Sequence, residues 1–231
     1  TGNTLFLNVL FIAATTITSV AIAIMLAEIS NKWVKKITQS IVILPHFMSW
    51  TIVSMLSVAI LSANGVVNQL ITMVGGKTIE FYNTPSVWPA ILVILKVWQG
   101  AGFGSIVYLA TITGIDASIY EAAAVDGASK TQCIFKVTLP MLKNTIIMLT
   151  IMSVGKIFNG DFGMIYAMVG SNSILYPTTD VIDTYLFRQL LENPSMGQTA
   201  AVGLIQSILG FGFVVLCNKV ANKWSPESAL F

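Results

Sequence analysis

The sequence is short of charge: only 10% of its 231 residues are Asp, Glu, Lys or Arg, against roughly a quarter in ordinary soluble domains. Hydrophobic residues make up 55% of the chain, and the mean hydropathy is +0.80. So few charges cannot cover the surface of a soluble domain of this size. The composition therefore excludes a soluble enzyme, a nucleic-acid-binding domain and a disordered chain, and it predicts a protein whose solvent is lipid.

Cysteine, histidine and nucleotide-binding motifs are scarce as well. Cys133 and Cys217 lie far apart and form no CxxC pair, which argues against a disulfide framework or a zinc ribbon. The single histidine, His46, has no neighbouring ligand residues for a metal site. The chain also has no G-x-x-x-x-G-K-[ST] phosphate loop. We therefore expect a non-catalytic protein that binds no cofactor of its own.

Long uncharged runs are what the sequence does contain. A helix that crosses a hydrocarbon core of about 30 Å needs about 20 apolar residues. Five segments meet this requirement: 4–27, 38–61, 86–113, 139–158 and 199–217. A shorter run at 66–74 predicts an interfacial helix. The expected fold is all-α, a polytopic transmembrane helix bundle that forms one domain over residues 1–231.

The lysines are distributed unequally between the two sets of connections. One set carries Lys32, Lys35, Lys36, Lys130, Lys136, Lys219 and Lys223. The other carries Lys77 and Arg188, with Lys156 at its border. Because positive charge is retained on the cytoplasmic side, the first set and the C-terminus are predicted to be cytoplasmic. Residues 159–198 then form an extracytoplasmic region, with an amphipathic helix expected near 181–191.

The cytoplasmic connection 114–140 has the signals of a helix pair. Ser118-x-x-Glu121 and Ser129-x-x-Gln132 each fit a capping box, and Asp126-Gly127 between them fits a turn. The second helix is predicted to continue into the fourth span at Pro140, since proline is tolerated in a first helical turn. A rigid helix pair at this position is suited to docking another protein.

The same connection resembles the EAA loop of binding-protein-dependent ABC importer permeases, which have the type I, maltose-type fold. The residues that match the motif are Glu121, Ala122, Ala123, Asp126, Gly127, Val137, Leu139 and Pro140. Val137 stands where isoleucine is usual, and Asp126 resembles the sugar-importer branch. Segments 44–50 and 180–185 are similar to oligosaccharide and polysaccharide permeases.

The resemblance implies a transport subunit of the bacterial cytoplasmic membrane, with six core helices and one of them before Thr1. It implies a second permease subunit, expected to be a different chain, and two ATPase subunits that carry ATP and Mg²⁺ and bind the EAA loop. An extracytoplasmic binding protein would deliver the carbohydrate. Glu121 has a purely structural alternative, as part of a helix cap.

Polar residues within or beside the spans are candidates for the substrate path: His46, Trp50, Lys96, Gln99, Asn159, Asp161 and Gln206. His46 and Trp50 are four apart and would share a helix face, where an aromatic ring and a polar ring suit a sugar. Helix packing is the alternative for both, and outward snorkelling is the alternative for Lys96. Gly100-x-x-x-Gly104 indicates close helix packing.

Three other functions stay open on the sequence. One is an ABC importer permease for a solute other than sugar. Another is a secondary transporter or channel that uses Lys96 as a coupling or gating charge, although we find no paired broken helices or inverted repeats. The third is a membrane scaffold. Co-purification of an ATPase would separate the importer from these rivals.

Overall fold

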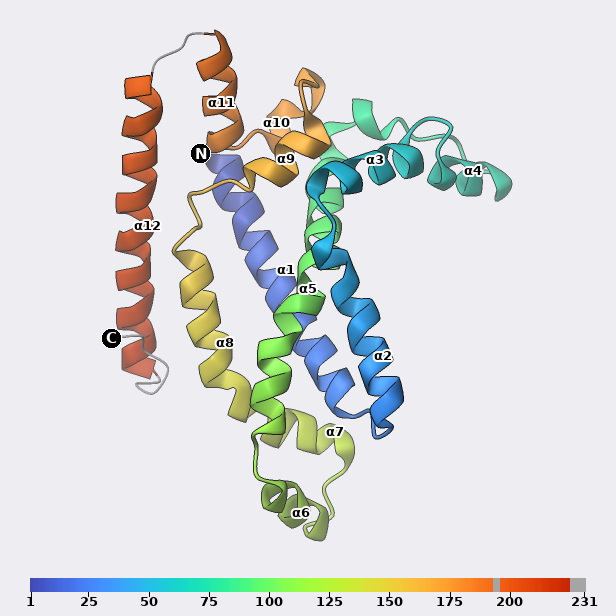
Figure 1. Cartoon of the computed structure of the whole chain (residues 1–231), viewed down its shortest axis with the longest axis vertical. Helices are drawn as coiled ribbons and strands as arrows, with labels where there is room; N and C mark the ends of the chain where they lie inside the picture. The colour runs from blue at the N-terminus through green and yellow to red at the C-terminus, as the bar shows by residue number, and fades with distance from the viewer. Residues whose placement is uncertain (193–195, 225–231) are drawn as a thin grey trace. The chain divides into compact units, whose positions relative to one another are not determined.

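The computed structural model describes residues 1–192 and 196–224, and every regular element in these residues is helical (Figure 1). Five stretches of helix are long and apolar enough to cross a membrane: Gly2–Ala27, Trp50–Met73, Pro85–Thr113, Lys130–Val154 and Gly197–Lys223. The predicted all-α class and the number of spans are therefore confirmed.

The long helices are α1 (Gly2–Ala27), α5 (Trp88–Thr113), α8 (Leu139–Val154) and α12 (Met196–Trp224). Shorter α-helices are α2 (Lys32–Ile43), α3 (Trp50–Leu61), α4 (Val66–Met73), α6 (Ala117–Val125), α7 (Lys130–Cys133), α9 (Phe162–Val169), α10 (Tyr176–Thr179) and α11 (Ile182–Glu192). Single turns of 3₁₀-helix are η1 (Leu44–Phe47), η2 (Phe81–Asn83), η3 (Pro85–Val87) and η5 (Ser173–Leu175), and η4 (Ile134–Thr138) is a π-helix.

The chain divides into two compact units, each assembled from three separate segments. Unit 1 contains Thr1–Phe11, Phe47–Leu95 and Ile157–Gly210. Unit 2 contains Ile12–His46, Lys96–Lys156 and Phe211–Phe231. Each unit has its own cluster of buried apolar side chains.

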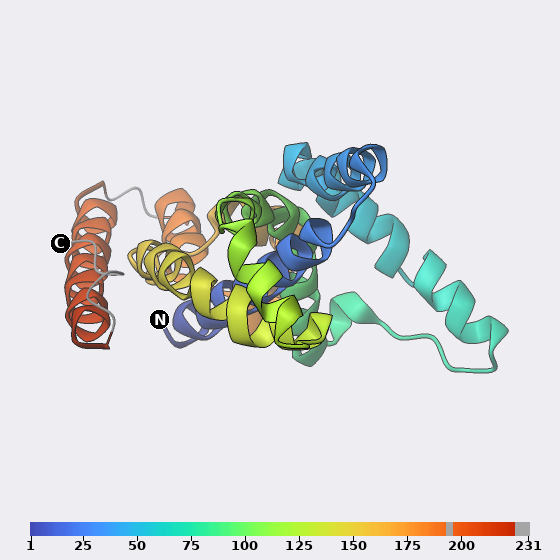
Figure 2. The ribbon, with the colours of Figure 1, turned by 90° about the horizontal axis from the view of Figure 1, so that it is seen from below.

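The core of unit 1 forms around α9, which is apolar on most of its surface. Met164, Ile165 and Met168 of α9 are buried together with Val53 of α3 and Trp88. The Trp88 indole N–H donates to the Phe81 carbonyl at 2.8 Å, so this fully buried ring keeps its polar group satisfied. Two views show α4 leading on from α3 (Figures 1 and 2).

The loop after α4 is fixed by one buried amide. Asn68 donates to the carbonyls of Ser62 at 3.0 Å and Ile79 at 2.9 Å, and it accepts from the Ile79 N–H at 2.8 Å. The predicted interfacial helix at 66–74 is confirmed as a helix, α4. Its exposed apolar residues include Val66, Leu70 and Met73.

The core of unit 2 forms where parts of α1, α5 and α8 pack together. Ala23, Tyr108 and Leu142 are among its buried residues. Glycines let α5 approach its neighbours closely. A Cβ at Gly104 would lie 2.7 Å from Ser19 Oγ on α1, and one at Gly102 would lie 2.0 Å from the Val42 carbonyl on α2. The close packing predicted from Gly100-x-x-x-Gly104 is thus observed, and Gly102 adds a tighter contact that the sequence did not indicate.

The second predicted span, 38–61, is wrong as a single helix. The chain forms α2, the turn η1 and then a new helix, α3, which begins after Ser49. Pro45 has no N–H for the carbonyl four residues earlier, and the Ser49 hydroxyl accepts from the Ile52 N–H at 3.4 Å. The fourth predicted span, 139–158, also ends early, because α8 stops at Val154.

Candidate functional site

The connection 114–140 folds as the predicted helix pair, but its first cap differs from the prediction. Asp116 is the N-cap of α6, and its carboxylate accepts the Ser118 backbone N–H at 2.9 Å. This hydrogen bond lowers the pKa of Asp116. The proposed capping box of Ser118 and Glu121 is therefore wrong, because α6 begins at Ala117 and places Glu121 beyond its first turn. Glu121 is left without a capping role.

The turn and the second helix of the loop match the prediction. Gly127 has φ +72°, a left-handed conformation that favours glycine. Ser129 caps α7 through a complete capping box: its hydroxyl accepts the Gln132 N–H at 3.3 Å, and the Gln132 side chain accepts the Ser129 N–H at 2.8 Å. The helix then runs through η4 into α8, with Pro140 in the first turn.

A hydroxyl pair joins the two ends of the loop. The Tyr120 hydroxyl lies 3.0 Å from the hydroxyl of Thr138, which is buried at the start of α8. Lys130 also lies 3.6 Å from Glu28, but both side chains are too exposed for this ion pair to contribute much. The helix pair is thereby attached to α8 by side chains as well as by the backbone.

The loop exposes both charged and apolar side chains. Glu121, Ala122, Asp126, Gly127 and Pro140 are exposed, while Ala123, Val137 and Leu139 are half-buried. Val125 is 88% exposed and Phe135 is 65% exposed. Exposed apolar residues of this size beside carboxylates are typical of a protein interface.

A second candidate site is a pocket in the membrane-spanning part of unit 2. It lies between the middle of α1, the later half of α5 and the end of α8. Its lining is Thr15, Thr16, Ser19, Phe103, Gly104, Val107, Tyr108, Leu149, Met152, Ser153 and Lys156. Besides aliphatic side chains, the lining contains the hydroxyl groups of threonine, serine and tyrosine and the aromatic rings of Phe103 and Tyr108.

Two features of this pocket bear on ligand binding. The ring of Phe103 stacks on His46, with centroids 4.1 Å apart and planes 6° from parallel. The Thr15 Oγ1 atom is buried without a hydrogen-bond partner in the part of the chain that the structure describes. Sequence reasoning missed the pocket residues, because threonine and serine do not interrupt an apolar run. The spacing of Thr15 and Ser19 by four in an otherwise apolar helix was the available signal.

The predicted path residues are divided between the two units. The helix break at η1 removes the expected common face of His46 and Trp50. His46 packs on Phe103 in unit 2, whereas Trp50 packs against the core of unit 1. Lys96 and Gln99 are half-buried on α5. Neither of them lines the pocket described above.

The remaining three candidates have structural contacts in unit 1. Asp161 is the N-cap of α9 and accepts the Met164 N–H at 3.2 Å. The Asn159 carbonyl accepts from Asn8 at 3.0 Å. Gln206 is buried and donates to the Phe158 carbonyl at 2.8 Å.

These contacts belong to a larger set that holds segment 157–160. Asn8 of α1 also donates to the Ile157 carbonyl at 2.9 Å. Asp183 of α11 accepts the Gly160 N–H and, at 3.3 Å, the Gln206 amide. Side chains from α1, α11 and α12 thus supply hydrogen bonds to the backbone of this segment between α8 and α9, where polar backbone groups in a membrane protein need partners.

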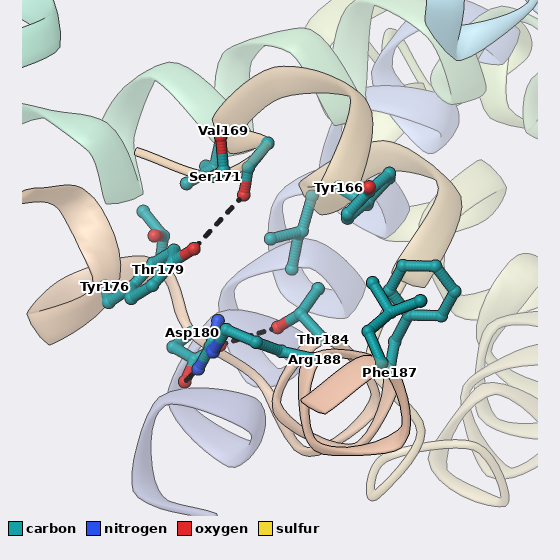
Figure 3. Close-up of a pocket in the computed structure, with 12 residues that line it drawn as sticks. Tyr166, Val169, Ser171, Tyr176, Thr179, Asp180, Thr184, Phe187 and Arg188 are labelled. Carbon is teal, nitrogen blue, oxygen red and sulfur yellow. Dashed lines mark hydrogen bonds and ion pairs between the residues drawn. The ribbon is translucent and has the colours of Figure 1, made fainter. Parts of the chain in front are cut away.

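The region 159–198 is more helical than predicted. The amphipathic helix expected at 181–191 is confirmed as α11, and α9 and α10 precede it. A pocket between them is lined by Tyr166 and Phe187 on one side and Tyr176 on the other (Figure 3). Residues 193–195, which the prediction included, lie outside the described part of the chain.

Arg188 contacts two other residues that line the pocket between α9, α10 and α11. Its guanidinium donates to the Asp180 carboxylate at 2.7 Å and lies 4.0 Å from the centre of the Tyr176 ring. The hydrogen bond to Asp180 raises the pKa of Arg188 further above its usual range. The contact links α11 to the residue that follows α10.

The chain is similar to known membrane transport components. Residues 19–224 match the family described as binding-protein-dependent transport system inner membrane component. The chain is 32% identical to the polygalacturonan/rhamnogalacturonan transport system permease protein YteP of Bacillus subtilis, over 97% of this chain and 70% of that protein. It is 31% identical to the protein LplB of the same organism, over 89% of this chain and 64% of that protein.

The fold is similar to that of a solved structure of an ABC transporter. The crystal structure of a bacterial alginate ABC transporter, in complex with a periplasmic protein bound to an alginate pentasaccharide, matches with a TM-score of 0.91 and 34% identity. The match covers 97% of this chain and 77% of that one. On these grounds the chain belongs to the family of binding-protein-dependent ABC transporter permeases, the inner membrane components of such systems.

Proposed function

We propose that this chain is the membrane-spanning subunit of an ATP-driven importer for oligosaccharides or polysaccharide fragments. In this proposal a binding protein delivers the carbohydrate from outside, and two ATPase subunits use ATP and Mg²⁺ on the cytoplasmic side. A second permease subunit, a different chain, completes the path. The C-terminus and the connection 114–140 are cytoplasmic.

The exposed helix pair of 114–140 carries the coupling part of the proposal. Its turn is fixed by Gly127, its second helix by the capping box of Ser129, and its ends by the Tyr120–Thr138 contact. A load applied to α6 or α7 is therefore transmitted to α8 instead of being absorbed by a flexible loop. An ATPase bound here would move α8 and so change access to the membrane pocket.

Glu121 is the residue to which we assign the ionic contact with the ATPase. It is exposed and, in the structure, makes no cap for α6. A carboxylate among exposed apolar residues can form a charge-assisted hydrogen bond with a cationic group when the interface excludes water. Val125 and Phe135 would provide the apolar part of that interface.

The carbohydrate class is supported by the pocket in unit 2 and by the relatives. The exposed hydroxyl of Ser153, which donates to the Leu149 carbonyl, can accept a hydrogen bond from a sugar hydroxyl, and the aromatic ring of Phe103 can contact the apolar face of a sugar ring. Relatives are described as acting on polygalacturonan, rhamnogalacturonan and alginate. The predicted candidates Lys96 and Gln99 remain proposals for another part of the path.

Substitution of Glu121 tests the proposal in the complete transporter. Glu121→Lys should abolish most uptake and release the ATPase during purification, because it removes a charge-assisted bond and opposes like charges in a desolvated contact. Glu121→Gln should cause a mild to moderate loss. The measurements are uptake of labelled oligosaccharide by cells and the amount of ATPase retained on the purified complex.

Glu192→Lys is the matched control, since it makes the same charge change at an exposed residue outside the loop. It should retain both uptake and ATPase. Normal transport and normal ATPase retention in Glu121→Lys would contradict the coupling role. A complex that purifies without any ATPase in the wild type would contradict the importer function itself.

A further inference from the structure

Lys156 is a charge at an unusual place. It follows the end of α8 by two residues and lines the pocket of unit 2 together with Thr15, Phe103 and Ser153. It is the only charged residue among the pocket lining, which otherwise consists of hydroxyl, aromatic, aliphatic and glycine residues. The pocket therefore has one net positive charge.

No carboxylate neutralises this charge from within. Among residues 1–192 and 196–224, the Lys156 side chain forms neither an ion pair nor a hydrogen bond. By contrast, Arg188 and Lys130 each have a carboxylate partner. Lys156 is exposed, and an ionisable residue that lines a pocket among membrane-spanning helices is a candidate for substrate contact by default.

The position of the pocket strengthens this argument. Thr15 and Ser19 lie near the middle of α1, so the pocket is located at membrane depth and away from the ends of that helix. The pocket that Lys156 lines therefore extends from the end of α8 to residues in the middle of α1.

We propose that Lys156 recognises the carboxylate of an acidic sugar, so that the pocket prefers uronate-containing oligosaccharides to neutral ones. The inference rests on the proposed carbohydrate function and adds to it the substrate class and the residue that selects it. Sugar hydroxyls would meet the exposed Ser153, and the sugar ring would contact Phe103. The Lys156 ammonium would donate to the carboxylate.

The test compares two probes in cells that express the complete transporter with its partner subunits: a trimer of galacturonate and a trimer of galactose. Lys156→Gln should reduce uptake of the galacturonate trimer at least about 10-fold, as the loss of a hydrogen bond between charged groups predicts. Uptake of the galactose trimer, though weaker in the wild type, should not fall. Lys156→Arg should retain most of the acidic uptake, because it keeps the charge.

Lys143→Gln is the matched control, because Lys143 is an exposed lysine on α8 outside the pocket lining. It should leave the ratio of acidic to neutral uptake unchanged. An equal fall for both probes in Lys156→Gln, or no fall at all, would overturn the assignment while the carbohydrate function stands. So would a wild type that imports only the neutral trimer. A wild type that imports neither would contradict the proposed function on which the inference rests.

Discussion

At the scale of single residues, Trp50 shows how the structure changes an expectation. As a predicted partner of His46 it was a candidate for stacking on sugar. In the structure it begins α3 and packs against the unit 1 core, and a Cβ at Gly163 of α9 would lie 3.8 Å from the Trp50 Cδ1 atom. Packing between α3 and α9 is therefore the main role that its contacts support.

Trp50→Ala should destabilise the protein and leave the affinity for substrate largely unchanged. Removal of a half-buried tryptophan leaves a cavity between α3 and α9, which we expect to cost about 2 kcal/mol, less than for a fully buried ring. Trp50→Phe should cost less. The measurements are the apparent melting temperature of the purified complex and the half-saturating substrate concentration for uptake.

Trp98→Ala provides the comparison for Trp50, since Trp98 is a tryptophan that is 43% exposed on α5. Its loss should change the melting temperature less. If Trp50→Ala instead kept the wild-type melting temperature and raised the half-saturating concentration, Trp50 would again be a candidate for substrate contact.

Residues of the cytoplasmic loop were predictable where local chemistry decides the structure. Gly127 and Ser129 were correctly predicted because a left-handed turn and a capping box each depend on a few adjacent residues. The first cap was wrong because the prediction took Ser118 as the N-cap, whereas Asp116, two positions earlier, caps α6 in the structure. The lining of the membrane pocket was missed because it depends on which faces of α1, α5 and α8 meet.

At the scale of helices, long apolar spans were predictable but interruptions within them were not. The run from residue 37 to 76 contains no charge, so hydropathy gave no boundary inside it. The boundary comes from Pro45, which has no N–H, and from the Ser49 cap. The packing of α2 on α5 is a separate tertiary contact, made close by Gly102.

Gly102→Ala should separate α2 from α5. A Cβ there would lie 2.0 Å from the Val42 carbonyl oxygen, a backbone atom that cannot rotate away. We expect a loss of about 1–3 kcal/mol, typical of overpacking, and a disturbed His46–Phe103 stack. The melting temperature and the uptake rate of the purified, reconstituted transporter should both fall.

Gly100→Ala is the control for this overpacking effect. Its Cβ would lie 3.8 Å from Thr15 Cγ2, an ordinary contact, and alanine favours helix over glycine. This variant should be as stable as the wild type or slightly more stable. Equal stability of Gly100→Ala and Gly102→Ala would show that α2 does not pack on α5 at this distance.

At the scale of the whole molecule, the orientation in the membrane rests on the distribution of lysine. The correction of the second span does not alter this, because Lys32, Lys35 and Lys36 still precede α3 and the number of spans remains five. The prediction for the connections is therefore unchanged: Lys77 and Glu192 are expected on one side of the membrane, and Lys130 on the other.

The orientation is testable with single cysteines in a variant whose free Cys133 and Cys217 are replaced by serine. Cysteines at positions 77, 130 and 192 would all be exposed on the protein, so reactivity reports the side of the membrane and not burial. In intact cells, an impermeant thiol reagent should label Lys77→Cys and Glu192→Cys but not Lys130→Cys. Permeabilised cells should label all three, which controls for reactivity. Labelling of Lys130→Cys in intact cells would place the 114–140 helix pair outside the cell. The orientation predicted from the lysines would then be wrong, and no cytoplasmic ATPase could bind the helix pair.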